Sequence, residues 1–398
     1  MLISTWINSQ VSKMQIDSPK IDNILENAAL QKVPAISAAV ISKDTNLYKG
    51  HFGFKDLENK NPVDDNTLFR IASMTKAITS TCIYQLIDRD ILSLDTNLKD
   101  FFPEISDKKV IQGFDDNGDV ILSDVSNDIN IGHLLTHTSG FAYEIWNESI
   151  AKLVERGDLQ SAFANNDEFL KAPLIFEPGT SWEYGIGIDW LGVLIEKISE
   201  CSLQEYMHTN IFEPLEMAST SYDLDKSKHS RVAKVYGRND DEYFEMPFEV
   251  PEKSSFYSGG GNLISSIEDY SKFLKIFLNA GQGPDRQIIS ISSHKSMLKS
   301  LNEELVMKQM LSQAPMLSED VDFFPSSTKS WSPGFMINHE DIDSGRPKNS
   351  AGWAGLFNSF FWIDPKNEIA AVILMQMLPF SEGGCLNTLK EFESSIYS

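Results

Sequence analysis

Cysteine is scarce in this chain. Only three occur in 398 residues, Cys82, Cys201 and Cys385, and they are far apart and odd in number. Such spacing builds neither a disulfide framework nor a cysteine-based metal knuckle. A protein of this kind fits a reducing compartment best.

Basic residues are also few. Lys and Arg together number 34 against 57 Asp and Glu, which gives a formal net charge of −23. An acidic surface repels phosphate groups, so we expect neither a nucleic-acid partner nor attachment to an anionic membrane. The chain is 41% apolar and 23% charged, which is the composition of a folded globular protein rather than a disordered one.

Long apolar runs are missing as well. The longest, Ile369–Met375, is far too short to cross a bilayer. The first eight residues, Met1–Asn8, lack the basic flank and apolar core of a signal peptide. We therefore expect a soluble, cytoplasmic protein.

Two enzyme motifs are absent too. The G-x-S-x-G nucleophile elbow of α/β-hydrolases does not occur, and neither does the H-E-x-x-H zinc motif. His133 and His137 have the spacing of metal ligands on one helix face, but no third ligand with a matching pattern is nearby. We interpret both histidines as structural, and we expect no metal and no cofactor.

The most informative stretch that is present is Leu68–Ser80, which contains Ser73-Met-Thr-Lys76. If a helix begins at Ser73, the serine lies among unpaired backbone N–H groups at the positive end of the helix dipole. Lys76 is about one turn later and shares its face. An amine beside a hydroxyl can activate a serine without histidine. Taken alone, the pattern favours a capping serine and an exposed lysine, so the rest of the chain has to decide.

The order of elements predicts the fold class. A helix over 21–31 and a hairpin over 35–54 open the chain, whereas strand-like runs over 332–337, 351–363 and 369–378 and a helix over 385–397 close it. We predict an α/β fold of the α+β type, with an antiparallel sheet flanked by helices and an inserted helical region. Residues 1–86 and 258–398 are expected to form the sheet-containing domain and 87–257 the insertion, with the active site between them.

The middle of the chain is less regular. A short helix over 131–141 is expected to close at Gly140, and Tyr184 is expected in an exposed, glycine-rich turn. Residues 225–257 are polar with interspersed aromatics, which favours a long loop or lid. A helix is predicted over 267–280, and 284–329 carries little signal.

Four segments occur in an order that identifies a family. They are Leu68–Lys76, Leu134–Gly140 (Leu-Leu-Thr-His-Thr-Ser-Gly), Pro178–Tyr184 and Gly259–Ser265. Together they resemble the nucleophile segment and the later conserved motifs of the serine β-lactamase and penicillin-binding-protein superfamily, in its class C-like branch. The resemblance covers nearly the whole chain and implies a β-lactamase-like fold.

The third motif narrows the resemblance. Penicillin-reactive members carry K-T-G on an edge strand, but the matching residues here are Trp353-Ala354-Gly355, and tryptophan has no positive charge to offer. Their Tyr-x-Asn motif is replaced by Tyr184-Gly185-Ile186. The pattern is more similar to family VIII carboxylesterases and to related fungal polyketide acyltransferases.

The resemblance implies an acyl-enzyme mechanism. Ser73 would attack the ester carbonyl, and Tyr184 near Lys76 would act as general base and later protonate the leaving alcohol. A free tyrosine has a pKa of about 10, so Lys76 either stabilises the tyrosinate or is itself the neutral base. The backbone N–H groups of Ser73 and Leu356 would form the oxyanion hole. Trp353, Ala354 and Gly355 would bind substrate, with Trp353 as a wall of the acyl groove.

The predicted function is therefore a serine carboxylesterase for small-molecule esters with small to medium acyl chains. The alternative is an acyltransferase that passes the acyl group to an alcohol or amine. A β-lactamase or peptidase is disfavoured because the groups that would recognise a β-lactam carboxylate are missing. A non-catalytic binding protein is disfavoured because Ser73, Lys76 and Tyr184 are all present. The physiological ester and the oligomeric state are left open.

Overall fold

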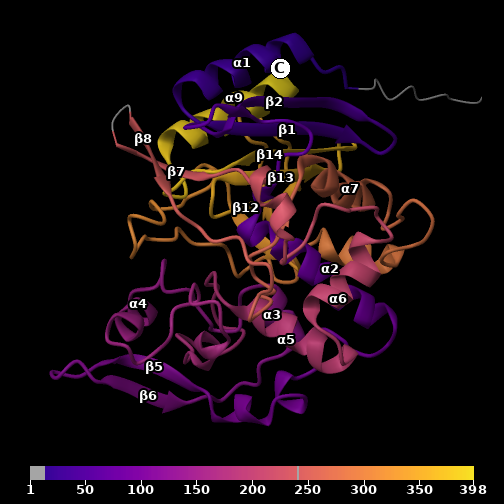
Figure 1. Ribbon diagram of the computed structural model, residues 1–398. Coiled ribbons are helices and arrows are strands. Elements are labelled where there is room, and N and C mark those ends of the chain that lie inside the picture. The colour runs from indigo at the N-terminus through magenta and orange to yellow at the C-terminus, as the bar shows by residue number, and fades with distance from the viewer. Residues whose placement is uncertain (1–13, 240–241) are drawn as a thin grey trace, which may run out of the picture.

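An antiparallel sheet of eight strands occupies the upper half of the molecule (Figure 1). The structure is a computed structural model that describes residues 14–239 and 242–398, so the N-terminal residues considered above lie outside it. In spatial order the strands are β10 (Lys329–Ser332), β11 (Phe335–Asn338), β12 (Ala351–Gly355), β13 (Ser359–Asp364), β14 (Ile369–Met375), β1 (Ala35–Ser42), β2 (Asn46–Asp56) and β3 (Asn61–Pro62).

Strands from opposite ends of the chain meet inside this sheet. β1 and β14 pair in register from Ile36 opposite Met375 to Ser42 opposite Ile369. Both strands are almost continuously apolar and buried, because helices cover the two faces of the sheet. α1 (Ser18–Gln31) and α9 (Gly383–Tyr397) lie on one face, and α7 (Ile267–Leu278) packs under β1 and β14 on the other (Figure 1).

Helices and one hairpin make up the lower half (Figure 1). α2 (Thr75–Asp88) lies where the halves meet and packs on α5. The other elements of this half are β5 (Lys109–Phe114), β6 (Val120–Asp124), α3 (Ile131–Leu135), α4 (Glu148–Glu155), α5 (Gly187–Ser199) and α6 (Leu203–Met207). Across the described ranges, no helix is both long enough and apolar enough to cross a membrane.

The predicted α+β class is confirmed, because the terminal elements formed as their patterns indicated. The apolar spacing over 21–31 belongs to α1, the hairpin over 35–54 to β1 and β2, and the closing helix to α9. In each case the hydrophobic period agrees with the face that packing buries.

One predicted strand is in fact two. The run over 351–363 breaks after Gly355, and β12 and β13 pair as a hairpin from Gly355 opposite Ser359 to Ala351 opposite Ile363. Asn358 has a φ of +62°, a conformation that asparagine tolerates better than most residues. The turn consists largely of apolar residues, and this hid it in the sequence.

The predicted loop or lid over 225–257 is also corrected. Its centre forms a hairpin, β7 (Val235–Asn239) with β8 (Glu242–Met246). Tyr236 fastens this hairpin to the sheet half, because its N–H donates to Gln376 O at 3.1 Å and its hydroxyl accepts from Leu57 N at 2.9 Å. The hairpin is therefore part of the packed structure.

Two further details differ from the prediction. The helix expected over 131–141 ends at Leu135, because His137 takes a left-handed φ of +57° that no α-helix can contain. In 284–329 the described structure contains α8 (Ile291–Met297) and otherwise mostly irregular backbone before β10. The short strands β4 (Phe69–Arg70) and β9 (Ile264–Ser265) pair beside the start of α2.

Candidate active site

Ser73 lies in a strained turn between β4 and α2. A single 3₁₀ turn, Ala72–Met74, precedes the α-helix, so the helix proper begins two residues after the serine. Ala72 has a φ of +43°, which costs a residue with a side chain roughly 1–2 kcal/mol. The turn is held from outside, since the Tyr270 hydroxyl donates to Met74 O at 3.0 Å. Strain that the surrounding fold maintains is characteristic of functional sites.

Lys76 lies directly beside Ser73 and is buried, with 1% of its surface exposed. Its Nζ is 3.1 Å from Ser73 Oγ, 2.7 Å from the Gly260 carbonyl and 3.0 Å from the Tyr143 hydroxyl. Burial lowers the pKa of Lys76 to about 7, and the negative charge of Asp189 opposes that shift. A sizeable fraction of this amine is therefore neutral near neutral pH.

Tyr184 joins the same group of side chains, but it is buried and not exposed as predicted. Only 2% of its surface is accessible, because Gly185 lets the chain pass against the Phe141 carbonyl. Its ring lies 4.8 Å from Lys76 Nζ. Burial raises the pKa of Tyr184 above its ordinary value, although contacts with Ser73 and Trp353 act in the opposite direction.

Trp353 touches Tyr184 directly. Its indole Nε1 donates to the Tyr184 hydroxyl at 2.9 Å, and its ring packs on Trp331 at 4.5 Å and on Phe323 at 5.6 Å. The side chain is 5% exposed, and its hydrogen bond fixes the position of the Tyr184 hydroxyl. Ala354 is buried in β12.

Gly355 allows β12 to approach the nucleophile turn. A Cβ atom at this position would lie 2.3 Å from the Ile71 carbonyl oxygen, which no packing tolerates. The strand therefore runs close to Ala72 and Ser73, and Leu356 follows at its end. All the residues predicted for the site are in this way brought to one place.

Three residues of this group were not predicted from the sequence: Tyr143, Asp189 and Gly260. Tyr143 donates its hydroxyl hydrogen to Asp189 Oδ2 at 2.7 Å, and Gly260 N donates to Asp189 Oδ1 at 3.0 Å. A Cβ on Gly260 would lie 2.5 Å from that carboxylate and 2.6 Å from the Tyr143 hydroxyl. The run of glycines over 259–261 was a signal for such crowding, whereas nothing in the local sequence distinguished Tyr143.

The two histidines have structural surroundings. The ring of His133 accepts the Asn130 N–H, while Asn130 Oδ1 accepts the His133 N–H, which closes a capping box on α3. His137 is buried with its ring 4.7 Å from those of Tyr184 and Trp331, and burial lowers its pKa well below the ordinary value. Within the described parts of the chain, no three His, Cys, Asp or Glu side chains are grouped as metal ligands would be.

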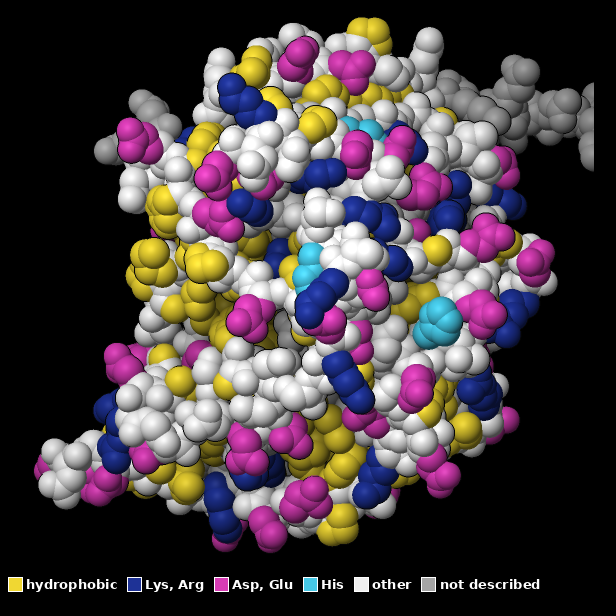
Figure 2. Space-filling view, in the orientation of Figure 1, with side chains coloured by type: hydrophobic (Ala, Val, Ile, Leu, Met, Phe, Trp, Pro, Cys, Tyr) yellow, Lys and Arg dark blue, Asp and Glu magenta, His cyan; other side chains and the backbone are white. Residues whose placement is uncertain are grey.

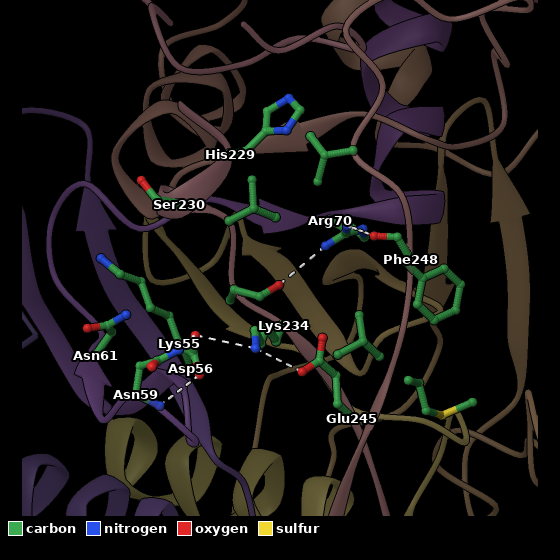
Figure 3. A pocket seen from close by; sticks show the side chains of 15 residues that line it. Lys55, Asp56, Asn59, Asn61, Arg70, His229, Ser230, Lys234, Glu245 and Phe248 are labelled. Carbon is green, nitrogen blue, oxygen red and sulfur yellow. Dashed lines mark hydrogen bonds and ion pairs between the residues drawn. The ribbon is translucent and has the colours of Figure 1, made fainter. Parts of the chain in front are cut away.

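A cavity of about 370 Å³ lies outside this group (Figure 3). Neither Ser73 nor Tyr184 lines it. Figure 3 shows Lys234 between the carboxylates of Asp56 and Glu245, at 3.3 and 2.8 Å. Arg70 donates to main-chain carbonyls there, including Phe248 O at 2.7 Å. The charged groups of this cavity are thus engaged with the protein itself.

The profile of one family, Beta-lactamase, matches residues 21–392, nearly the whole chain. The protein belongs to the Beta-lactamase family. It is 28% identical to the monacolin J acid methylbutanoyltransferase of Aspergillus terreus over 352 residues, covering 85% of this chain and 83% of the relative. It is 26% identical to the lovastatin esterase of Penicillium rubens over 357 residues, covering 85% and 87%.

Solved structures of the Beta-lactamase fold agree. The LovD6 mutant of simvastatin synthase from Aspergillus terreus superposes with a TM-score of 0.82 at 26% identity, over 95% of this chain and 96% of that one. EstCE1, a hydrolase with promiscuous acyltransferase activity, matches in fold with a TM-score of 0.75 at 17% identity, over 96% and 98%. The predicted resemblance, the β-lactamase-like fold and the assignment as an enzyme of ester chemistry are confirmed. Because the relatives include a transferase and an esterase, they support both the predicted hydrolysis and its acyl-transfer alternative.

Proposed function

We propose that this enzyme forms an acyl-enzyme on Ser73 and passes the acyl group of a carboxylic ester to an alcohol or to water. The observation that carries the proposal is the buried Lys76 amine, 3.1 Å from Ser73 Oγ, whose pKa burial lowers to about 7. A neutral amine at hydrogen-bond distance from a serine is a general base placed to activate it.

Lys76 is a better base than Tyr184 in this setting. Burial raises the pKa of Tyr184, so the phenol keeps its hydrogen at neutral pH and cannot accept the serine proton. As the bond from Ser73 Oγ to the acyl carbon forms, the hydroxyl proton therefore moves to Lys76 Nζ. The structure supports the second of the two alternatives that the sequence left open.

Tyr184 is suited to the opposite task. Trp353 Nε1 occupies one lone pair of its hydroxyl, so the phenol hydrogen remains free to donate toward the reacting ester. When the tetrahedral intermediate collapses, the bond to the leaving oxygen breaks, and that oxygen takes a proton from the Tyr184–Lys76 pair. The alcohol departs neutral. The same steps in reverse let a second alcohol, or water, release the acyl group.

Two backbone N–H groups are proposed to stabilise the negative oxygen of the intermediate, those of Ser73 and Leu356. The close approach of β12 to the Ser73 turn, which Gly355 permits, supports this assignment. Each such donor is typically worth about 10²–10³ in rate. Since Leu356 acts through its main chain, its side chain contributes only packing.

The substrate is proposed to be an apolar ester. Two large apolar side chains of the segment 301–316 are exposed to solvent: 53% of the surface of Leu311 and 65% of that of Met316 are accessible. The same stretch continues to Ser318, whose hydroxyl accepts from Trp146 Nε1 at 3.0 Å, and the Trp146 ring contacts Tyr184 at 5.4 Å. Hydrophobic side chains also gather on the left of the face in Figure 2, where the two halves of the molecule meet. An apolar acyl or alcohol group would find contacts beside the catalytic tyrosine.

The predicted division of the chain fits this proposal. Ser73 and Trp353 come from the sheet-containing regions 1–86 and 258–398, whereas Tyr143 and Tyr184 come from 87–257, so the site would lie between the two. The cytoplasmic location stays a prediction. The absence of nucleic-acid and membrane partners also stays a prediction, which the charge of −23 supports.

Partitioning of the acyl group tests the proposed function. With p-nitrophenyl butyrate and increasing 1-butanol, we expect butyl butyrate to form at the expense of butyrate, because both acceptors compete for one acyl-enzyme. The two products are measured by gas chromatography while p-nitrophenolate is followed by absorbance. Butyrate as the sole product at every alcohol concentration would restrict the enzyme to hydrolysis, and no release of p-nitrophenolate would refute the proposal.

A chromogenic cephalosporin serves as the negative control for that assay. Trp353 stands where penicillin-reactive enzymes have the cation that holds a β-lactam carboxylate. Its indole N–H already donates a hydrogen bond to the Tyr184 hydroxyl, so it is not available to the carboxylate of a cephalosporin. Efficient cephalosporin hydrolysis would contradict this interpretation of the third motif.

The pH dependence distinguishes the two candidate bases. Because the neutral form of Lys76 is active, kcat/KM should rise as pH increases through about 7, the pKa to which burial lowers this amine, and then level off. The profile is measured with p-nitrophenyl butyrate, using Ser73→Ala protein to subtract spontaneous hydrolysis. If the tyrosinate of Tyr184 were the base, the rate would keep climbing into strongly alkaline solution instead.

A further inference from the structure

Asp189 is a buried carboxylate that the steps above leave without a task. It lies in the first turn of α5 with 1% of its surface exposed. Its hydrogen-bond donors are neutral: the Tyr143 hydroxyl at 2.7 Å, Gly260 N at 3.0 Å and the Ser258 hydroxyl. Removing a charge from water is costly, and neutral donors offset only part of that cost. Something beyond local packing is therefore needed to explain a carboxylate here.

The hydrogen atoms around Lys76 are ordered by Asp189. Tyr143 has a single hydroxyl hydrogen, and Asp189 Oδ2 accepts it, so the Tyr143 oxygen can only accept from Lys76 at 3.0 Å. The Gly260 carbonyl, 2.7 Å from Nζ, can only accept as well. Both N–H bonds of a neutral Lys76 amine are then used. Its one lone pair remains, and the remaining neighbour at 3.1 Å is Ser73 Oγ.

We propose that Asp189 is a positioning residue for acylation: by holding the Tyr143 hydroxyl hydrogen and the Gly260 backbone, it directs the lone pair of Lys76 to Ser73. This rests on the proposed function, since it assumes that Ser73 is the nucleophile and Lys76 its base. Asp189 itself touches neither substrate nor the reacting atoms.

A purely structural role makes different predictions. A carboxylate in the first turn of a helix also favours the helix dipole, and Asp189 ties the 258–260 segment to α5. Loss of those contacts would lower the stability of the protein. It would leave kcat of the folded enzyme unchanged, whereas the profile would still move because the charge that favours the Lys76 ammonium is lost in either case.

Asp189→Asn separates the two roles. The side chain keeps its size, but the amide carries hydrogens of its own, so the Tyr143 hydroxyl is free to turn its hydrogen onto the lone pair of Lys76. We expect kcat to fall by about 10²-fold with little change in KM. The acid limb of the pH–rate profile, which is the part where kcat/KM rises with pH, should move to lower pH. The reason is that the negative charge that favours the Lys76 ammonium is gone. Four titratable side chains lie around Lys76 and act on its pKa or contact it: Tyr143, Tyr184, Asp189 and His137.

Asp269→Asn is the matched control. Asp269 is likewise a buried carboxylate, with 4% of its surface exposed, in the first turn of a helix, α7. It accepts hydrogen bonds from Ser219 N at 2.7 Å and Thr220 Oγ1 at 2.9 Å. It contacts none of the catalytic group. We expect this variant to lose stability on heating while kcat and the acid limb stay as in the wild type.

Active-site titration with diethyl p-nitrophenyl phosphate keeps this test independent of the proposed function. In that reaction a bond forms from Ser73 Oγ to phosphorus, p-nitrophenolate leaves, and the serine proton passes to Lys76. Stoichiometric but slower labelling of folded Asp189→Asn supports the inference. Full labelling at the wild-type rate overturns it, wherever the acid limb lies, and leaves the proposed function standing. Labelling that Ser73→Ala fails to prevent would overturn the proposed function instead. Should Asp189→Asn fail to fold, Tyr143→Phe, compared with the buried control Tyr84→Phe, tests the same hydrogen ordering through loss of kcat.

Discussion

Ser73→Ala is expected to abolish the hydrolysis of p-nitrophenyl butyrate. Alanine removes the oxygen to which the acyl group bonds, so only the backbone donors and Lys76 remain to act on the ester. Loss of a serine nucleophile in other acyl-enzymes lowers kcat by about 10⁶-fold. The measurement is p-nitrophenolate release at saturating substrate, together with mass spectrometry of enzyme quenched during turnover, where an acyl adduct should be present in the wild type and missing in the variant.

Ser80→Ala is the matched control for that loss. Ser80 is on the same helix, is fully buried, and its hydroxyl has no hydrogen-bond partner within the described structure. Removing an unsatisfied buried hydroxyl is neutral or slightly stabilising, so kcat/KM should be unchanged. A Ser73→Ala protein that retained the rate of Ser80→Ala would show that another residue carries the acyl group.

The proposed nucleophile, Ser73, could be selected from the sequence because its pattern is local. Ser73 and Lys76 are three residues apart, and helical geometry alone places them on one face. The turn that contains Ser73 was less predictable. Its left-handed residue is Ala72, and a positive φ at alanine is maintained by tertiary contacts rather than by local preference.

The rest of the site could not be found locally because its contacts are long-range. Lys76 meets Gly260 and Tyr184 meets Trp353 only after the two halves of the chain pack together, and Tyr143 meets Asp189 across 46 residues of the lower half. Tyr184 and Trp353 were reached through motifs. Tyr143 lacks a motif, so no periodicity or spacing could single it out from other buried aromatic residues.

The fold shows the same division. Hydrophobic period places the terminal helices and strands, since each buries the face that its sequence displays. The hydrophobic period did not predict the β12–β13 hairpin over 351–363, because the turn is as apolar as the strands. It also did not predict the hairpin within 225–257, a polar hairpin that Tyr236 attaches to the sheet. In both segments tertiary packing outweighs local pattern.

Lys76→Met should lower kcat by about 10³–10⁴-fold at every pH. Methionine has nearly the volume of the lysine stem, so the variant keeps the core filled while the base is lost. The acid limb near pH 7 that follows from the lowered pKa of Lys76 should vanish with it, because no neutral amine remains to be protonated. The measurement is the pH profile of p-nitrophenyl butyrate turnover, with thermal unfolding recorded to show that the variant folds.

Lys108→Met is the control that separates loss of the proposed base from the general effect of removing a buried lysine. Burial also lowers the pKa of Lys108, to about 8, but its Nζ donates to the carbonyls of Leu170 and Ala172 at 2.7 and 3.0 Å, far along the chain from any hydroxyl nucleophile. Leaving those carbonyls unpaired should cost this variant about 1–3 kcal/mol of stability while kcat and the acid limb remain. Equal losses of kcat in the two folded variants would mean that a buried amine anywhere in the core supports turnover. A loss confined to Lys76→Met would tie catalysis to the amine that lies 3.1 Å from Ser73 Oγ.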